Sequence, residues 1–107
     1  MKKGMIEMSS KSERIGLDSC VGRPKELPTA EVGGEVVMMS LDKGKYFALD
    51  SVGSRIWELM EKPQTVKEII QCLLEEYEVD EQTCRNNVLE FLNKLDEEGL
   101  MELIEDR

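Results

Sequence analysis

Histidine is absent from this chain of 107 residues, which removes the side chain that most often serves as a general base or a metal ligand. The cysteines are Cys20, Cys72 and Cys84, which stand far apart and form no Cys-x-x-Cys pair. An odd number of widely spaced cysteines is atypical of a disulfide framework or a zinc site. A nucleophilic cysteine would also lack a histidine as its base. We therefore expect no catalytic residues, no metal and no cofactor.

Long apolar stretches are also lacking, although 40% of the residues are hydrophobic. No segment approaches the roughly 20 apolar residues that a membrane helix requires. The charged N-terminus, Met1 to Gly4, is not followed by the apolar run of a signal peptide. The expected location is the cytoplasm, and no association with a membrane is expected.

Positive charge is scarce, since 14 basic and 23 acidic residues give a net charge of −9. So acidic a surface repels phosphate backbones and argues against nucleic-acid binding. Residues 1–25 show no sustained hydrophobic period and predict a flexible, loosely attached N-terminal arm. Residues 26–107 are then expected to form the single folded domain, which suits the length of the chain.

Short strands are predicted at the start of this domain, over Pro28–Val32, Glu35–Leu41 and Lys45–Leu49. Gly33-Gly34 supplies the positive φ angles of a tight hairpin turn, and Asp42-Lys43-Gly44 is a second turn signal. Two consecutive hairpins make an antiparallel meander whose middle strand is paired on both sides. The third strand is thereby left as an exposed edge unless another segment covers it.

Three amphipathic helices are predicted to follow the meander. The first begins at Asp50 or Ser51, the second at a capping box that starts with Thr65, and the third at Asp80. Gly99 ends the third helix, and a short packed tail over Leu100–Ile104 is expected after it. The apolar stripes at helical spacing are Val52, Ile56, Leu59 and Met60; Val66, Ile69, Ile70, Leu73, Leu74 and Tyr77; and Cys84, Val88, Phe91, Leu92 and Leu95. The fold class is therefore α+β, with a three-stranded antiparallel β meander followed by a three-helix winged helix-turn-helix-like bundle.

Two alternative functions follow from this fold class alone. A winged-helix regulator would read nucleic acid with the third helix, yet Arg85 and Lys94 are the only basic residues on its outward face. The charge therefore argues against it, because fold by itself does not decide function. The other alternative is a small structural or dimerisation module of a larger enzyme complex, which pairing of two copies through the open third strand would favour. The expected oligomeric state is a monomer or a homodimer.

Five segments between Gly34 and Leu100 carry a resemblance to a known family. They are Gly44–Asp50 (GKYFALD), Ser54–Leu59 (SRIWEL), Thr65–Ile69 (TVKEI), Glu76–Asp80 (EYEVD) and the pattern VxxFLxxLxxxGL over Val88–Leu100. In this order, they resemble the PqqD-like family, named for the small protein of pyrroloquinoline quinone biosynthesis. Asp50 departs from the asparagine that is usual at that position, but both residues cap helices.

The resemblance implies a peptide-binding module and not an enzyme. Members of the family bind the leader segment of ribosomally made precursor peptides and present it to separate modifying enzymes. The leader adds as a strand to the third strand of the meander, and the third helix forms the other wall of the groove. A chain of this length resembles the discrete leader-binding proteins of lasso-peptide pathways, whose partners are a leader peptidase and an ATP-dependent macrolactam synthetase, the lasso cyclase. A peptide chaperone in pyrroloquinoline quinone biosynthesis is the nearest alternative.

Candidate peptide-binding residues follow from the resemblance. They are Lys45, Tyr46, Phe47, Ala48 and Leu49 on the third strand, and Cys84, Arg85, Val88, Phe91 and Leu95 on the third helix. The helical stripe has a simpler interpretation as core, and Tyr46 has one as an exposed strand aromatic. The acidic body favours a basic leader, whereas Lys43, Lys45, Arg85 and Lys94 are able to pair with a leader carboxylate.

Overall fold

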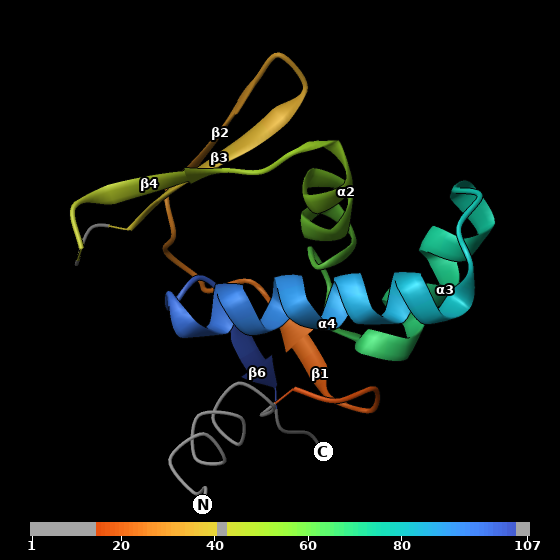
Figure 1. The fold of residues 1–107 in the computed structure, drawn as a ribbon. Helices are drawn as coiled ribbons and strands as arrows, with labels where there is room; N and C mark the ends of the chain where they lie inside the picture. The colour runs from red at the N-terminus through yellow and green to blue at the C-terminus, as the bar shows by residue number, and fades with distance from the viewer. Residues whose placement is uncertain (1–14, 41–42, 105–107) are drawn as a thin grey trace, which may run out of the picture.

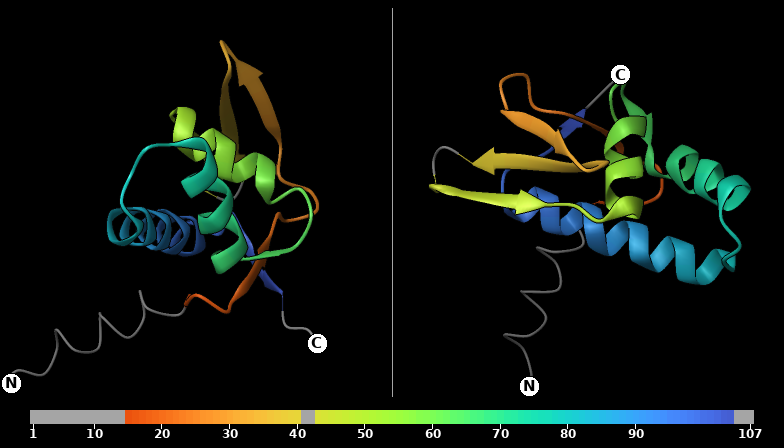
Figure 2. Two further views of the ribbon diagram at one scale, coloured as in Figure 1. Left: turned by 90° about the vertical axis from the view of Figure 1, so that its right-hand side faces the viewer. Right: turned by 90° about the horizontal axis from the view of Figure 1, so that it is seen from above.

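The computed structural model describes residues 15–40 and 43–104. Within these ranges the chain forms three helices and six short strands (Figure 1). The strands build two separate antiparallel sheets, which lie at opposite ends of the molecule with the helices between and beside them (Figures 1 and 2). No helix in the described ranges is long and apolar enough to cross a membrane.

The predicted meander is present as β2 (Thr29–Val32), β3 (Glu35–Ser40) and β4 (Lys45–Ala48), in the order β2-β3-β4. Both strand pairs are antiparallel. Gly33 and Gly34 adopt φ angles of 60° and 85°, as the first hairpin turn requires. The third strand of the meander, β4, lies at the edge of the sheet, so this part of the prediction is confirmed.

The three predicted helices are also present, as α2 (Ser51–Leu59), α3 (Val66–Glu76) and α4 (Glu81–Glu97). Each begins at a side chain that accepts a hydrogen bond from the backbone N–H three residues later, and these capping residues are Asp50, Thr65 and Asp80. The α+β fold class is confirmed, because local capping signals and local hydrophobic periods suffice to define these elements.

A second sheet was not predicted. It has the order β5-β1-β6 and consists of β1 (Cys20–Gly22), β5 (Gln64–Thr65) and β6 (Glu102–Ile104). Strands of two or three residues are too short to show a detectable alternation, and both partners of β1 lie far from it in the sequence. The expected tail at the C-terminus is the segment that provides β6.

The prediction of a flexible arm over residues 1–25 is wrong for residues 15–25. Ile15 is 3% exposed and Val21 is fully buried, and β1 is the middle strand of the second sheet. Backbone hydrogen bonds also join this segment to α3, because Lys67 N–H donates to the Leu17 carbonyl at 3.1 Å. Hydrophobic burial therefore attaches it to the domain, while residues 1–14 lie outside the described ranges.

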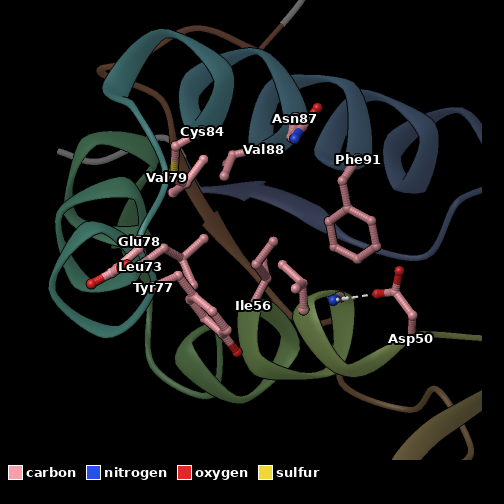
Figure 3. A pocket seen from close by; sticks show the side chains of 12 residues that line it. Asp50, Ile56, Leu73, Tyr77, Glu78, Val79, Cys84, Asn87, Val88 and Phe91 are labelled. Carbon is pink, nitrogen blue, oxygen red and sulfur yellow. Dashed lines mark hydrogen bonds between the residues drawn. The ribbon is translucent and has the colours of Figure 1, made fainter.

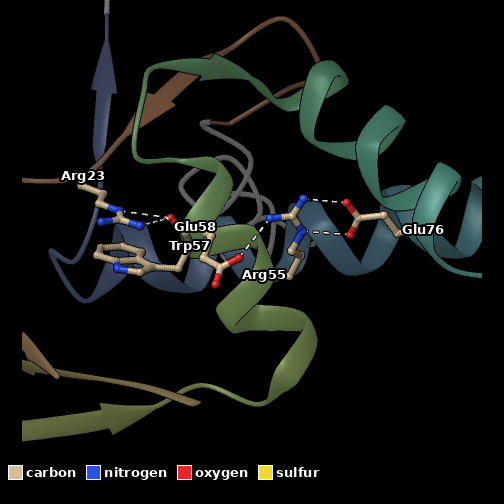
Figure 4. A network of polar contacts seen from close by, with 5 residues as sticks. All are labelled: Arg23, Arg55, Trp57, Glu58 and Glu76. Carbon is tan, nitrogen blue, oxygen red and sulfur yellow. Dashed lines mark hydrogen bonds and ion pairs between the residues drawn. The ribbon is translucent and has the colours of Figure 1, made fainter. Parts of the chain in front are cut away.

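Charged side chains join the helices on one side of the core (Figure 4). Arg55 of α2 makes a two-pronged contact with Glu76 of α3, at 2.9 and 2.6 Å. Arg23, which follows β1, donates to the Trp57 carbonyl and lies 4.8 Å from the centre of its ring. These contacts fix α2 against α3 and against the second sheet, which holds the elements around the candidate site in place.

Candidate functional site

The outer edge of β4 presents unpaired backbone groups. Leu49 N–H donates to the Val36 carbonyl at 2.9 Å, and the register places these two residues directly opposite each other. Hydrogen-bonded and non-hydrogen-bonded pairs alternate along an antiparallel ladder. Phe47 is therefore bonded to β3, while the N–H and C=O groups of Tyr46 and Ala48 point away from it. No described strand pairs with β4 on that side, so these groups are free to bind another strand.

The side chains of β4 alternate between the two faces of the sheet. Phe47 is half-buried and packs against the hydrophobic core, and Leu49 just beyond the strand is 8% exposed. Tyr46 lies on the opposite face and is 70% exposed. Lys45 shares the face of Phe47, with its Nζ atom 5.7 Å from the centre of that ring. A strand added beside β4 would thus meet Lys45 and Phe47 on the core side and Tyr46 on the outer side.

An apolar groove with a volume of about 490 Å³ begins where β4 ends. It lies between α2 and α4 and is closed at the far side by the segment that links α3 to α4 (Figure 3). Phe91 and Asp50 lie at the end nearest to β4, and Tyr77 and Glu78 lie at the other end. The lining residues are mostly apolar: Val52, Gly53, Ile56, Leu73, Val79, Cys84 and Val88, with the polar Asn87 on α4.

Gly53 allows α2 and α4 to approach each other closely at the groove. A Cβ atom at Gly53 would lie 3.1 Å from the Phe91 Cε1 atom and 3.2 Å from the Asp50 Oδ1 atom, both tighter than ordinary contacts. Gly53 also donates its N–H to the Asp50 carboxylate at 2.8 Å, which starts α2. The absence of a side chain here sets the position of the Phe91 ring, which forms one wall.

An ion pair places the C-terminal end of α4 beside the turn that precedes β4. Lys43 Nζ lies 2.8 Å from a carboxylate oxygen of Glu98, and this hydrogen bond lowers the pKa of the Glu98 carboxyl. The contact between Gly53 and Phe91 places the middle of α4 beside the segment after β4. Together the two contacts align α4 alongside β4, in the opposite direction, and the apolar groove begins at Asp50, two residues beyond the end of the strand.

The groove contains one thiol, and its surroundings make it a poor nucleophile. The one thiol in the groove, that of Cys84, is buried, and burial raises its pKa, with Asp80 and Glu81 adding to the effect. A raised pKa means less thiolate at neutral pH and therefore a poor nucleophile. Among the described residues no group of three or more cysteine, aspartate and glutamate side chains is arranged to hold a metal ion.

The structure brings most of the predicted site residues together. Lys45, Tyr46, Phe47 and Ala48 form the edge strand, and Cys84, Val88 and Phe91 line the groove. Leu49 and Leu95 are buried in the core, so they support the site from beneath. Arg85 does not reach the groove: it lies on the α3 side of α4, near Leu17 and Lys67, and pairs with Glu81 at 3.4 Å.

The groove residues of α2 and of the link between α3 and α4 were not predicted as site residues. Val52, Tyr77 and Val79 are 41%, 38% and 36% exposed, and they lie together in the groove as one apolar patch. The sequence carried one signal for them, because Val52 and Tyr77 each begin or end a helical apolar stripe. Only the packing of α2 against α4 shows that these ends meet at one place.

The family model of coenzyme PQQ synthesis protein D (PqqD) matches residues 35–101. This span contains β3, β4, all three helices and the whole groove. A comparison with curated protein sequences finds no match.

Solved structures similar to this chain include two complexes with leader peptides. TbiB1 in complex with the TbiA(beta) leader peptide is 36% identical, with a TM-score of 0.71, and the match covers 79% of this chain and 99% of that one. Lasso peptide synthetase B1 complexed with its leader peptide is 20% identical, with a TM-score of 0.69, covering 77% and 96%. The PqqD truncation of Methylobacterium extorquens PqqCD, a stand-alone recognition element for ribosomally synthesised and post-translationally modified peptides, is 18% identical, with a TM-score of 0.71, covering 86% and 98%.

Proposed function

This chain belongs to the PqqD family, and we propose that it is a non-catalytic protein that binds the leader segment of a ribosomally synthesised precursor peptide. The leader adds as a fourth strand to the edge of β4, and its apolar side chains enter the groove between α2 and α4. The observation that carries this proposal is the free edge at Tyr46 and Ala48 together with the apolar groove that begins at Asp50, two residues beyond β4.

Strand addition divides the binding energy between two sources. Backbone hydrogen bonds to Tyr46 and Ala48 are independent of the leader sequence, whereas side chains that fill the groove provide selection. A short added strand buries an area at the low end of stable interfaces, so the affinity depends on a few anchor side chains. Val52, Phe91 and Tyr77 are the apolar groups that these anchors would contact.

Within this function we assign the chain to lasso-peptide biosynthesis in the cytoplasm. There it would present the precursor to a leader peptidase and to an ATP-dependent lasso cyclase. A peptide chaperone in pyrroloquinoline quinone biosynthesis is the second candidate, as the name of the family model suggests. The identity of 36% to TbiB1, against 18% to the PqqD truncation, favours the first assignment.

A nuclear magnetic resonance titration of the full chain with the TbiA(beta) leader peptide tests the proposal. We expect the amide signals of Tyr46, Ala48, Val52 and Phe91 to shift as the peptide is added. Signals of Val21, in the second sheet, serve as the internal control and are expected to stay in place. Shifts confined to regions away from β4 and α4 would contradict the assignment of the groove.

A further inference from the structure

The hydrogen bonding between β3 and β4 changes at the end of their ladder. Leu49 N–H donates to the Val36 carbonyl at 2.9 Å, as the register requires. In a regular antiparallel pair, Val36 N–H would donate back to the Leu49 carbonyl. It donates instead to the Ser54 hydroxyl at 3.0 Å, and this hydroxyl donates to the Leu49 carbonyl at 3.3 Å. A side chain of α2 is therefore inserted into the ladder.

One hydroxyl group satisfies both backbone groups at this point. Serine offers one donor and two acceptor positions, so the Ser54 Oγ atom accepts from Val36 and donates to Leu49 at the same time. Ser54 is 5% exposed, and a buried N–H group without a partner is costly. The hydroxyl bridge therefore joins α2 to the backbone of β3 and to the end of β4, in a place largely closed to water.

The same turn of α2 forms part of the groove wall. Val52 and Gly53, which come just before Ser54, line the groove. A Cβ atom at Gly53 would lie 3.4 Å from the Leu49 Cβ atom and 3.1 Å from the Phe91 Cε1 atom. This turn is therefore packed between the end of β4 and the ring of Phe91 (Figure 3). The hydroxyl bridge fixes it on the side of β4.

A bound leader would contact both sides of this junction. In the proposed mode, its backbone pairs with Tyr46 and Ala48, and its apolar side chains enter the groove beside Val52. Two contacts made by one ligand strengthen each other only when the distance between them matches the ligand. The junction between β4 and α2 sets this distance on the protein. We propose that Ser54 is the positioning residue that fixes the groove relative to the free edge of β4, an inference that rests on the proposed strand addition.

Loss of the hydroxyl would release α2 from the ladder. Val36 N–H would then either lack a partner or bond directly to the Leu49 carbonyl, as in a regular antiparallel pair. Both arrangements break the hydrogen bond that joins β3 to α2. The groove wall would no longer be held at a fixed distance from the free edge, and a leader would lose part of the advantage of binding to both.

Calorimetric titration of the full chain with the TbiA(beta) leader peptide measures this loss. Ser54→Ala should weaken binding about fivefold, within the range of coupling between neighbouring groups. Ser54→Thr keeps the hydroxyl and should restore the affinity to within about twofold of the wild type. Ser51→Ala is the matched control, because it removes the hydroxyl of an exposed serine from the same turn, and it should leave the affinity unchanged. Circular dichroism verifies that each variant remains folded.

A double-mutant cycle with Ala48→Pro separates positioning from a general loss of stability. Ala48→Pro removes an outward N–H of β4 and so weakens the contact at the free edge. If Ser54 links this edge to the groove, Ser54→Ala should weaken binding by less than about twofold once Ala48→Pro is present. A purely structural effect of Ser54 would not depend on whether the edge is engaged, and the fivefold loss would persist.

The outcomes separate the inference from the proposed function. Unchanged affinity in Ser54→Ala, or an equal loss with and without Ala48→Pro, overturns the inference while leaving strand addition intact. A loss that the folded Ser54→Thr variant does not reverse assigns the effect to packing and also overturns it. Binding that is unaffected by Ala48→Pro, or no binding to the wild-type chain, overturns the proposed function and the inference with it. A loss in Ser54→Ala that Ser54→Thr reverses and Ala48→Pro abolishes supports both.

Discussion

The two sheets of this protein differ in almost every physical respect although each has three strands. The sheet β5-β1-β6 is assembled from distant parts of the chain, and Val21 at its centre is fully buried. The sheet β2-β3-β4 is built from consecutive hairpins and carries exposed apolar side chains on its outer face, with Val32, Met39 and Tyr46 being 65%, 42% and 70% exposed. The sheet β5-β1-β6 closes the core, while the sheet β2-β3-β4 presents an edge and a face to the surroundings.

This difference separates stability from recognition within one small domain. A buried strand contributes through the apolar area that it removes from water. An open edge strand contributes little to folding and is a liability unless another chain is meant to pair with it. We therefore expect substitutions in the sheet β5-β1-β6 to affect unfolding and substitutions around β4 to affect peptide binding.

The largest expected effect on stability is the difference between a charge placed in the buried sheet β5-β1-β6 and a charge placed in the exposed sheet β2-β3-β4. Val21→Asp buries an unpaired carboxylate and should cost several kcal/mol, roughly enough to unfold a domain of this size. Val32→Asp, on the exposed face of β2, should change stability by no more than about 0.5 kcal/mol. Urea denaturation followed by circular dichroism measures both. Similar losses in the two variants would contradict the contrast between the sheets.

The second-largest effect is expected on peptide binding, when proline is placed on one or the other free edge of the sheet β2-β3-β4. Ala48→Pro removes an outward N–H without breaking a bond to β3, and it should weaken peptide binding roughly tenfold, about 1.4 kcal/mol. Glu31→Pro is the matched control, because the bond from Met39 N–H to the Pro28 carbonyl places the Glu31 N–H on the outer edge of β2. It should leave binding unchanged. Equal weakening by both variants would argue against pairing at β4.

A smaller effect is expected where α2 approaches α4. Gly53→Ala places a methyl group 3.1 Å from the Phe91 ring, which should move toward the groove and weaken peptide binding roughly threefold. Stability should change by less than about 1 kcal/mol, because the higher helix propensity of alanine is offset by its close approach to the Asp50 carboxylate that caps α2. Gly16→Ala adds a methyl group into open space and serves as the control. Calorimetric titration measures the affinity, and an unchanged affinity for the Gly53 variant would remove Phe91 from the binding wall.

The smallest effect is expected from the ion pair that joins α2 to α3. The hydrogen bond from Arg55 lowers the pKa of the Glu76 carboxyl below its ordinary value of 4.5. The contribution to stability is therefore complete above pH 4.5 and is lost as the pH falls through the lowered value in the folded state.

Because this pair is exposed and screened by solvent, Glu76→Gln should cost less than about 1 kcal/mol at neutral pH. Denaturation curves of this variant and the wild type should converge at acidic pH, while peptide affinity at neutral pH stays the same. A difference in stability that persists at low pH would assign the effect to packing and not to charge.

Local signals made the meander and the helices predictable. Gly33 and Gly34 define a tight turn, and the capping box at Thr65 defines a helix start, because each depends on residues only a few positions apart. The second sheet had no such signal, since its strands are very short and its pairs, such as Cys20 with Ile104, are distant in sequence. For the same reason residues 15–25 were mistaken for part of a loose arm.

Part of the candidate site, like part of the fold, was predictable from the sequence. The edge strand and one wall, with Val88 and Phe91, followed from the meander, the helical period and the resemblance. The second wall, with Val52 and Ile56, and the closing segment with Tyr77 depended on how α2 packs against α4. A helical period identifies which face is apolar, but it does not show which apolar residues stay uncovered after packing.

The sequence by itself determined the local elements, the acidic net charge and the open third strand, because these depend on neighbouring residues and on composition. Only the tertiary structure decided that α4 runs alongside β4, that the groove begins just beyond the end of that strand, and that Arg85 faces away from the groove. These properties arise from contacts between segments far apart in the chain, such as Lys43 with Glu98, which no local pattern encodes.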